Sequence, residues 1–192
     1  EFMREQIEQK LQQGYSCLKL KIGAIDFETE LSLIKSIRSR FSADELTLRV
    51  DANGAFSPTE APFKLEKLAA FDLHSIEQPI KAGQPGEMRK LIAQQILHIA
   101  LDEDLIGMQD KSIAEYINPD YIILKPSFLG GIQATRDWID WASEKGKEWW
   151  ITSALESNIG LQAIAQLTGD YDVKIPQGLG TGQLYTNNFA SG

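Results

Sequence analysis

The chain has 192 residues, which suits one domain or a large part of one, and its 43% hydrophobic and 24% charged residues are typical of a globular protein that buries a core. A formal net charge of −8, without any basic stripe, argues against nucleic acid as a partner, so an anionic substrate would need local cations. The chain has a single cysteine and no apolar run long enough to cross a bilayer, and we expect a cytoplasmic protein with no membrane partner.

Short apolar runs rich in β-formers alternate along the chain with longer segments of helical period. The predicted strands are 17–22, 46–51, 74–78, 98–102, 121–125 and 149–153, with one more expected at 171–175. The predicted helices are 3–13, 26–40, 58–70, 86–96, 109–116, 131–145 and 157–168. Several of them have start or stop signals, such as Gly14 after the first helix and Gly146 after the sixth.

This alternation predicts parallel strands joined by right-handed crossovers, and therefore an α/β fold. An open doubly wound sheet and a closed (β/α) barrel both produce such a pattern. The chain holds about seven strands, one fewer than a barrel requires, and it begins partway into a helical pattern. Both architectures stay open at this point, and we interpret the chain as a fragment that has lost its beginning.

The first predicted strand, CLKLKI, carries two lysines among apolar residues. Alternate residues of a strand point to opposite faces, so Leu18 and Leu20 would share one face, and Lys19 and Lys21 the other. Taken alone, this pattern favours an antiparallel strand with a solvated lysine face. The rest of the chain favours a different explanation.

Each of the first six predicted strands has, at or next to its end, a polar or ionisable side chain that a buried strand would normally avoid. The series is Lys21, Asp51, Glu77, Asp102, Lys125 and Ser153, and its members lie one strand-plus-helix unit apart. A single residue of this kind is explained by a solvated strand end or a helix N-cap. Six at equivalent positions indicate that the side chains meet at the carboxyl ends of the strands, where a (β/α) barrel has its active site.

Three successive members of the series, Asp51, Glu77 and Asp102, are carboxylates that would repel one another unless a cation joined them. Oxygen ligands favour a hard ion, and three carboxylates with open positions suit octahedral Mg²⁺ better than Zn²⁺. His74 and His98 lie at the starts of their strands and are expected to be structural. The sequence therefore predicts a Mg²⁺ site formed by the three carboxylates.

Lysines flank the carboxylates in the chain, with Lys21 before them and Lys125 after them. An exposed lysine is protonated near neutral pH and cannot act as a base. Burial, a nearby dication and a second ammonium group all disfavour the protonated form, and Lys19 lies on the same strand face as Lys21. The pair therefore predicts one lysine that transfers a proton and a neighbour that tunes and positions it.

With these residues assembled, the chain resembles the barrel domain of the enolase superfamily, in its muconate-lactonizing-enzyme-like branch. The matching signatures are KLK (19–21), RVDAN (49–53), IEQP (76–79), ALDE (100–103) and ILKP (123–126). The resemblance covers nearly the whole chain. It implies that residues 1–192 form a single, partial (β/α) TIM-type barrel domain of about seven strands that lacks the first strand and the N-terminal capping domain, as an N-terminally truncated fragment of a longer enzyme. It also implies enediolate chemistry that uses a lysine base and Mg²⁺.

The resemblance further implies that Asp51, Glu77 and Asp102 bind the metal and that Lys21 and Lys125 are facing catalytic lysines, with Lys19 beside them. Residues implied to lie next to the metal ligands or the substrate are Asn53, Glu103, Ser153 and Gly180. The segments SALESNIGL (153–161) and GLGTGQLYTNNF (178–189) imply one reaction within the branch. It is syn dehydration of 2-succinyl-6-hydroxy-2,4-cyclohexadiene-1-carboxylate to 2-succinylbenzoate in menaquinone biosynthesis.

Other functions remain open at this point. A dipeptide epimerase would usually carry Asp-x-Asp in the last loop, where this chain has the uncharged GLGTG (178–182), whereas an N-acylamino acid racemase shares an uncharged loop. Because the chain has glycine-rich segments, a phosphate-binding barrel is a further alternative. Because a strand is missing, a catalytically inactive fragment is another. An unclosed barrel would have exposed strand edges, through which we expect possible self-association.

Overall fold

A computed structural model describes residues 2–181 and 187–189. The chain divides into two compact units, which are described separately: Glu1–Glu103 with Ser112–Pro119, and Asp104–Lys111 with Asp120–Gly192. Both units are α/β with parallel strands. The predicted fold class, a partial (β/α) barrel, is therefore confirmed, whereas a single domain over residues 1–192 stays a prediction.

The first unit contains a parallel sheet of four strands in the order β1-β2-β3-β4. Its strands are β1 (Cys17–Lys21), β2 (Thr47–Asp51), β3 (Ser75–Glu77) and β4 (Ile99–Leu101). Its helices are α1 (Phe2–Gln12), α2 (Phe27–Arg38), α3 (Ala61–Ala69), α4 (Pro85–Ile92) and most of α5 (Lys111–Ile117). The register places Lys21 beside Asp51 and Asp51 beside Glu77, so the predicted strand-end residues are aligned.

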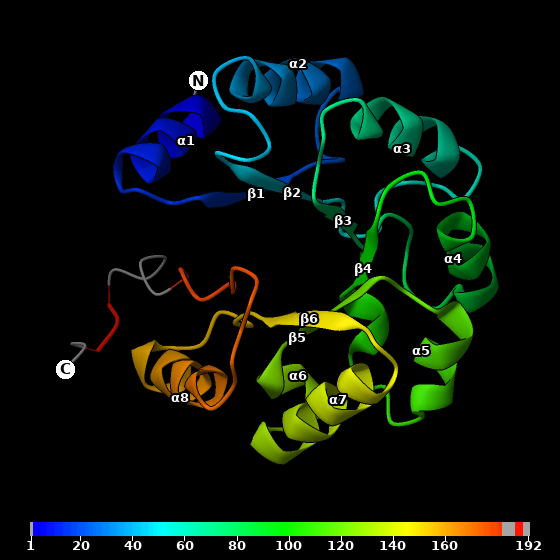
Figure 1. The fold of residues 1–192 in the computed structure, drawn as a ribbon, viewed down its shortest axis with the longest axis vertical. Helices are drawn as coiled ribbons and strands as arrows, with labels where there is room; N and C mark the ends of the chain where they lie inside the picture. Colours follow the sequence, from blue (N-terminus) through cyan, green and yellow to red (C-terminus); the bar gives the residue numbers. More distant parts are fainter. Residues whose placement is uncertain (1, 182–186, 190–192) are drawn as a thin grey trace. The chain divides into compact units, whose positions relative to one another are not determined.

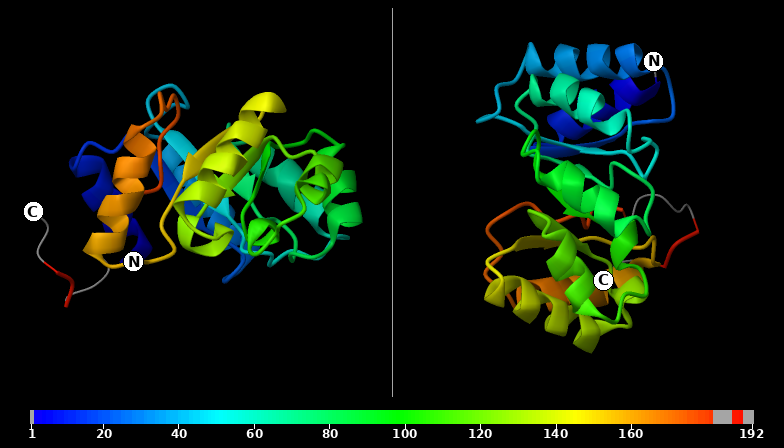
Figure 2. Two further views of the ribbon diagram at one scale, coloured as in Figure 1. Left: turned by 90° about the horizontal axis from the view of Figure 1, so that it is seen from below. Right: turned by 90° about the vertical axis from the view of Figure 1, so that its right-hand side faces the viewer.

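The core of the first unit lies between the sheet and the helices α2 and α3, which run side by side along it (Figures 1 and 2). Leu48 and Ile76 from the sheet are fully buried, as are Ile34 of α2 and Leu65 of α3. Burying each such side chain contributes about 1.5–3 kcal/mol. Leu48 and Val50 of β2 alternate with Arg49 and Asp51, so the polar side chains of this strand lie on the side opposite its core-facing leucine and valine.

The second unit contains β5 (Tyr121–Leu124) and β6 (Glu148–Ile151), which pair in parallel with Leu124 beside Ile151. Its helices are α6 (Pro126–Leu129), α7 (Ile132–Glu144) and α8 (Asn158–Gly169), and a short 3-10 helix, η1 (Glu103–Leu105), joins the units. Helix α7 buries Trp138, Trp141 and Ala142 at helical spacing, as expected of an amphipathic helix.

One predicted element is wrong: residues 171–175 form no strand. The middle of that segment is solvent-exposed, and Pro176 directly after it has no backbone N–H to donate to a neighbouring strand. A parallel bridge forms slightly later, between Thr152 and Gly178. A Cβ at Gly178 would lie 2.7 Å from Thr152 Oγ1, so the close approach at this bridge requires glycine.

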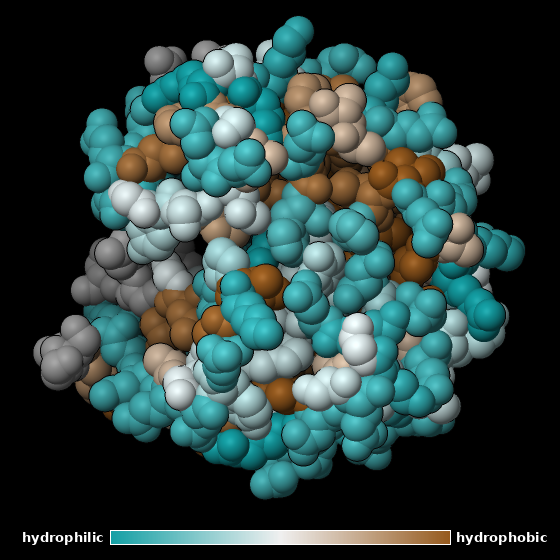
Figure 3. Space-filling view, in the orientation of Figure 1, coloured by the Kyte–Doolittle hydropathy of each residue, from teal (hydrophilic) through white to brown (hydrophobic). Residues whose placement is uncertain are grey.

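The molecular face seen in Figure 3 is mostly hydrophilic, with separate apolar patches rather than a continuous band. Among the residues that the structure describes, no helix has the length and apolar character needed to cross a membrane. The cytoplasmic location stays a prediction.

Candidate metal centre and flanking lysines

The carboxyl ends of β2, β3 and β4 bring together three carboxylates, those of Asp51, Glu77 and Asp102. Asp51 and Glu77 are the last residues of their strands, and Asp102 directly follows β4. All three side chains are buried, and each offers one oxygen that lies within 4.8 Å of the other two. This acidic triad could hold a metal ion.

Burial makes the charge of Glu77 costly. It raises the pKa of Glu77 to about 7; the ammonium of Lys19 opposes this rise, whereas the charges of Asp51 and Asp102 add to it. Glu77 Oε1 is buried and has no hydrogen-bond partner among the described residues. An unsatisfied buried carboxylate oxygen costs at least about 1–3 kcal/mol, and a bound cation would remove that cost. The donor set therefore fits a hard divalent ion.

Lys19 joins two of the three carboxylates. Its Nζ donates to Asp51 Oδ2 at 3.1 Å and to Glu77 Oε2 at 2.9 Å. Burial by itself would lower the pKa of Lys19, but the charges of Glu77 and Asp51 outweigh burial and raise it above its usual value. Lys19 is therefore held as an ammonium group in contact with the triad.

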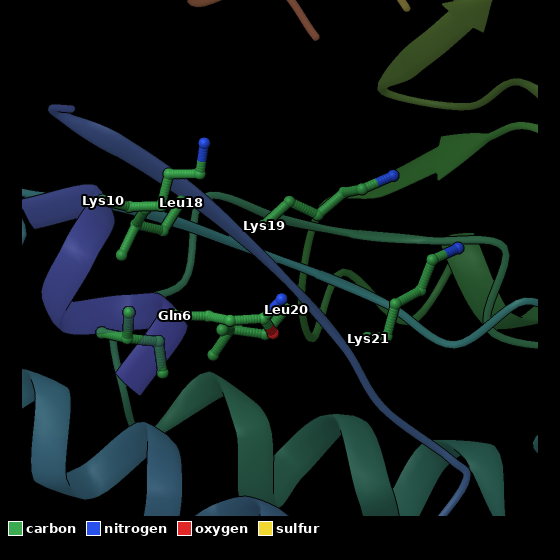
Figure 4. A pocket seen from close by; sticks show the side chains of 7 residues that line it. Gln6, Lys10, Leu18, Lys19, Leu20 and Lys21 are labelled. Atoms are coloured by element: carbon green, nitrogen blue, oxygen red, sulfur yellow. The ribbon is translucent and has the colours of Figure 1, made fainter. Parts of the chain in front are cut away.

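Lys21 lies on the same side of β1 and contacts the outer part of the cluster. Its Nζ is 2.6 Å from Asp51 Oδ2 and 2.5 Å from Asn53 Oδ1. Figure 4 shows both lysines extending to one side of the strand, whereas Leu18 and Leu20 lie toward α1. The predicted division of the strand into a lysine face and an apolar face is confirmed. Although burial would raise the pKa of Asp51, the two lysines hold it below its usual value.

Asn53 connects Lys21 to Glu103, the acidic residue directly after Asp102. Its backbone N–H donates to Asp51 Oδ1 at 3.0 Å, and its Nδ2 donates to Glu103 Oε1 at 2.7 Å. Asn53 adopts a left-handed backbone, with φ of 45°, which turns the chain sharply after β2. The structure thus places Asn53 and Glu103 next to the carboxylate triad, and their roles toward a metal or a substrate stay predictions.

The remaining predicted site residues belong to the second unit. Lys125 directly follows β5 and is the N-cap residue of α6. Ser153 is buried just after β6, and its Oγ hydrogen-bonds with Thr181 Oγ1 and accepts from the backbone N–H of Leu155. Gly180 is exposed in the loop after the Gly178 bridge. Their roles toward a substrate stay predictions.

The sequence analysis missed two buried residues that position the cluster. Gln78 Oε1 accepts a hydrogen bond from the backbone N–H of Asp102 at 3.2 Å, and Gln78 Nε2 donates to the backbone carbonyl oxygen of Ile80 at 3.0 Å. Gln78 therefore holds the backbone of Asp102, the third carboxylate residue, in place. Glu30 Oε1, from α2, accepts a hydrogen bond from the backbone N–H of Gly23 at 2.7 Å, which holds the loop after Lys21 in place. Gln78 lies inside the IEQP signature, but its contacts depend on the neighbouring strand.

Parallel β-α units that gather carboxylates and lysines at the carboxyl ends of the strands define a barrel-type protein with a candidate metal centre. The chain belongs to the enolase C-terminal domain-like family, whose sequence profile matches residues 2–177. The resemblance to the enolase superfamily that the signatures indicated is therefore confirmed.

Two relatives and one solved structure illustrate how similar the chain is to known proteins. It is 59% identical to o-succinylbenzoate synthase of Desulfotalea psychrophila over 193 residues, which cover 99% of this chain and 52% of that protein. It is 29% identical to L-Ala-D/L-Glu epimerase of Bacillus subtilis, covering 86% of this chain and 46% of that protein. The crystal structure of MenC from D. psychrophila matches with a TM-score of 0.92 and 57% identity, covering 99% of this chain and 53% of that one. The chain thus spans about half the length of these relatives.

Proposed function

We propose that this chain is the barrel part of an o-succinylbenzoate synthase, a lyase that acts in menaquinone biosynthesis. The reaction is the dehydration of 2-succinyl-6-hydroxy-2,4-cyclohexadiene-1-carboxylate to 2-succinylbenzoate. One structural observation carries the chemistry: Lys21 Nζ lies 2.6 Å from Asp51, a member of the buried carboxylate triad. A proton-transferring group and a cation site are therefore adjacent, which suits abstraction of a proton next to a carboxylate. The 59% identity to the D. psychrophila synthase supports this particular substrate.

Asp51, Glu77 and Asp102 would hold Mg²⁺, since three carboxylates from separate strands leave coordination positions open. When bound, the ion would supply positive charge that stabilises the negative charge developing on the substrate carboxylate. Glu77 Oε1, buried without a partner among the described residues, is the oxygen that supports this assignment most directly.

In the proposed reaction Lys21, as the neutral amine, removes the α-proton, and the electron pair of the C–H bond moves toward the carboxylate to give an enediolate. The C–O bond to the ring hydroxyl then breaks, the electrons return to form the aromatic ring, and Lys21 donates the same proton to the departing hydroxyl. One water leaves for each 2-succinylbenzoate formed. Asn53 orients Lys21 through its 2.5 Å contact, and Lys125 is proposed as the cation on the opposite side of the anion.

A racemase or epimerase of amino acid derivatives is the second candidate. It is favoured by the 29% identity to L-Ala-D/L-Glu epimerase, and it would use Lys21 and Lys125 as bases on opposite faces of one carbon. The absence of a carboxylate in GLGTG (178–182) weakens the dipeptide version, because a substrate ammonium group would have no acidic partner in that segment.

The deciding experiment assays the complete protein that contains this chain, with and without Mg²⁺. The cyclohexadiene carboxylate is tested beside a panel of N-acyl amino acids and dipeptides. We expect dehydration of the cyclohexadiene that stops when a chelator is added and returns with Mg²⁺. Racemisation or epimerisation of the panel without any dehydration would contradict the proposed function.

A further inference from the structure

Lys19 contacts the acidic triad in a way that proton transfer does not require. Its ammonium lies 3.1 Å from Asp51 Oδ2 and 2.9 Å from Glu77 Oε2, so one positive charge is shared between carboxylates from two strands. Lys21 contacts only one of these carboxylates, that of Asp51. The Lys19 side chain is also the less exposed of the two, at 35% compared with 60% for Lys21.

A divalent ion on the triad would draw on the negative charge of the same two carboxylates. Asp51 and Glu77 are completely buried, so water screens neither the carboxylates nor a cation near them effectively. An ammonium and a divalent ion that share these partners repel each other across a few ångströms. The ammonium therefore lowers the affinity of the carboxylates for the divalent ion, and the divalent ion weakens the contacts between the carboxylates and the ammonium.

We propose that Lys19 is the built-in counter-ion of the Asp51–Glu77 pair and competes with a divalent cation for it. This inference rests on the cation site of the proposed function but not on the dehydration reaction. It assigns Lys19 two linked effects. Lys19 offsets the mutual repulsion of the buried carboxylates when no divalent ion is bound, and it lowers the affinity for that ion, which keeps binding reversible.

The test replaces Lys19 with an uncharged side chain of similar length, in Lys19→Met, in the otherwise unaltered chain. Mn²⁺ is the probe, because it prefers the same oxygen ligands as Mg²⁺ and the free ion is counted by electron paramagnetic resonance. We expect the dissociation constant for Mn²⁺ to fall roughly tenfold. After chelation, we expect the unfolding midpoint to fall by roughly 2–6 °C relative to wild type, and Mn²⁺ to restore it.

Two control variants separate the shared contact from simple loss of charge. Lys21→Met removes the same charge from a more exposed side chain that touches one carboxylate, and it should tighten Mn²⁺ binding by roughly threefold or less. Lys90→Met removes a 72% exposed lysine that pairs with Glu87, and it should change the dissociation constant by less than about twofold.

Mn²⁺ binding by Lys19→Met that is unchanged or weaker than wild type would overturn the inference, because Lys19 would then only orient the carboxylates. If Lys19→Met folds only with Mn²⁺, the counter-ion role is supported. If it does not fold at all, Lys19→Gln is measured by the same criterion. Absence of Mn²⁺ binding in every protein, wild type included, would remove the cation site and this inference together. If the wild type binds Mn²⁺ and Lys19→Met binds it no more tightly, only this inference is contradicted.

Discussion

Lys21 and Lys125 are the residues that separate dehydration from racemisation. In a syn elimination one lysine handles the proton, so Lys21→Ala in the complete protein should abolish exchange of the substrate α-proton with solvent deuterium. We expect turnover to fall roughly 10²- to 10⁴-fold, as for loss of a general base. Lys125→Arg keeps the positive charge and should leave part of the exchange, which proton NMR in D₂O measures.

Racemisation would give a different pattern of exchange. Each lysine would then serve one enantiomer, so either substitution would stop exchange from one enantiomer of an N-acyl amino acid and spare the other. That one-sided loss, without dehydration of the cyclohexadiene, would contradict the assignment of Lys21 as the sole base.

The acidic triad was predictable from the sequence, but its contacts with Lys19 were not. Asp51 and Glu77 recur at the ends of strands one β-α unit apart, and parallel pairing brings such ends to one edge of a sheet. Lys19, in contrast, reaches across β2 to Glu77 on β3. That contact depends on the register and twist of three strands, which no local pattern in the sequence specifies.

His74, at the amino end of β3, makes the stability of the chain depend on pH. Burial lowers its pKa from 6.5 to about 4, and Arg49 and His98 contribute. Because the folded pKa is the lower one, the stability due to neutral His74 is fully present above pH 6.5 and is lost as the pH falls toward 4. Allowing for partial exposure, we expect a loss of about 1–2 kcal/mol between pH 7 and 4.5, measured by urea unfolding.

A matched variant isolates this contribution from that of other titrating groups. His74→Gln should flatten the pH dependence of unfolding over this range, because glutamine does not titrate. If the variant keeps the slope of the wild type, groups other than His74 control it.

At the scale of elements, the loop between β1 and α2 depends on one buried carboxylate. Glu30 Oε1 accepts the backbone N–H of Gly23 and, at 3.4 Å, that of Ile25. Glu30→Ala removes the acceptor of both hydrogen bonds and should lower the free energy of unfolding by about 1–3 kcal/mol. Because the loop begins directly after Lys21, hydrogen exchange of residues 22–26 should also become faster, which mass spectrometry detects.

The control for this prediction lies on the same helix. Glu28 is in the first turn of α2 and exposed, so Glu28→Ala should change stability by no more than about 0.5 kcal/mol. Equal effects of the two substitutions would mean that Glu30 stabilises the helix end rather than the loop.

The elements themselves were predicted from local patterns with two kinds of error. Helix α6 spans only Pro126–Leu129, too short for a periodic signal to reveal it. The segment 171–175 alternates like a strand, yet a strand forms only where a partner edge accepts its hydrogen bonds, and pairing occurs at Gly178 instead. The local sequence indicates which secondary structure a segment prefers, but not whether a neighbouring strand edge is available to pair with it.

At the scale of the whole molecule, the outer edge of β1 is the feature that affects association. Within the described part of the first unit β1 pairs only with β2, and a pocket of about 280 Å³ lies between β1 and Gln6, Ile7 and Lys10 of α1 (Figure 4). Unpaired strand edges recruit other strands. We expect self-association that increases with concentration, seen by light scattering as a mass above 21.4 kDa. A constant mass of 21.4 kDa at every concentration would contradict this prediction.

Every residue of the acidic cluster and its two contacting lysines, from Lys19 to Glu103, comes from the first unit. In evolutionary terms, one contiguous stretch of gene encodes every contact of this candidate cation site. Substitutions in the loops of the second unit therefore leave these contacts between carboxylates and lysines unchanged, and a recombination event that carried residues 19–103 alone would transfer all of them together.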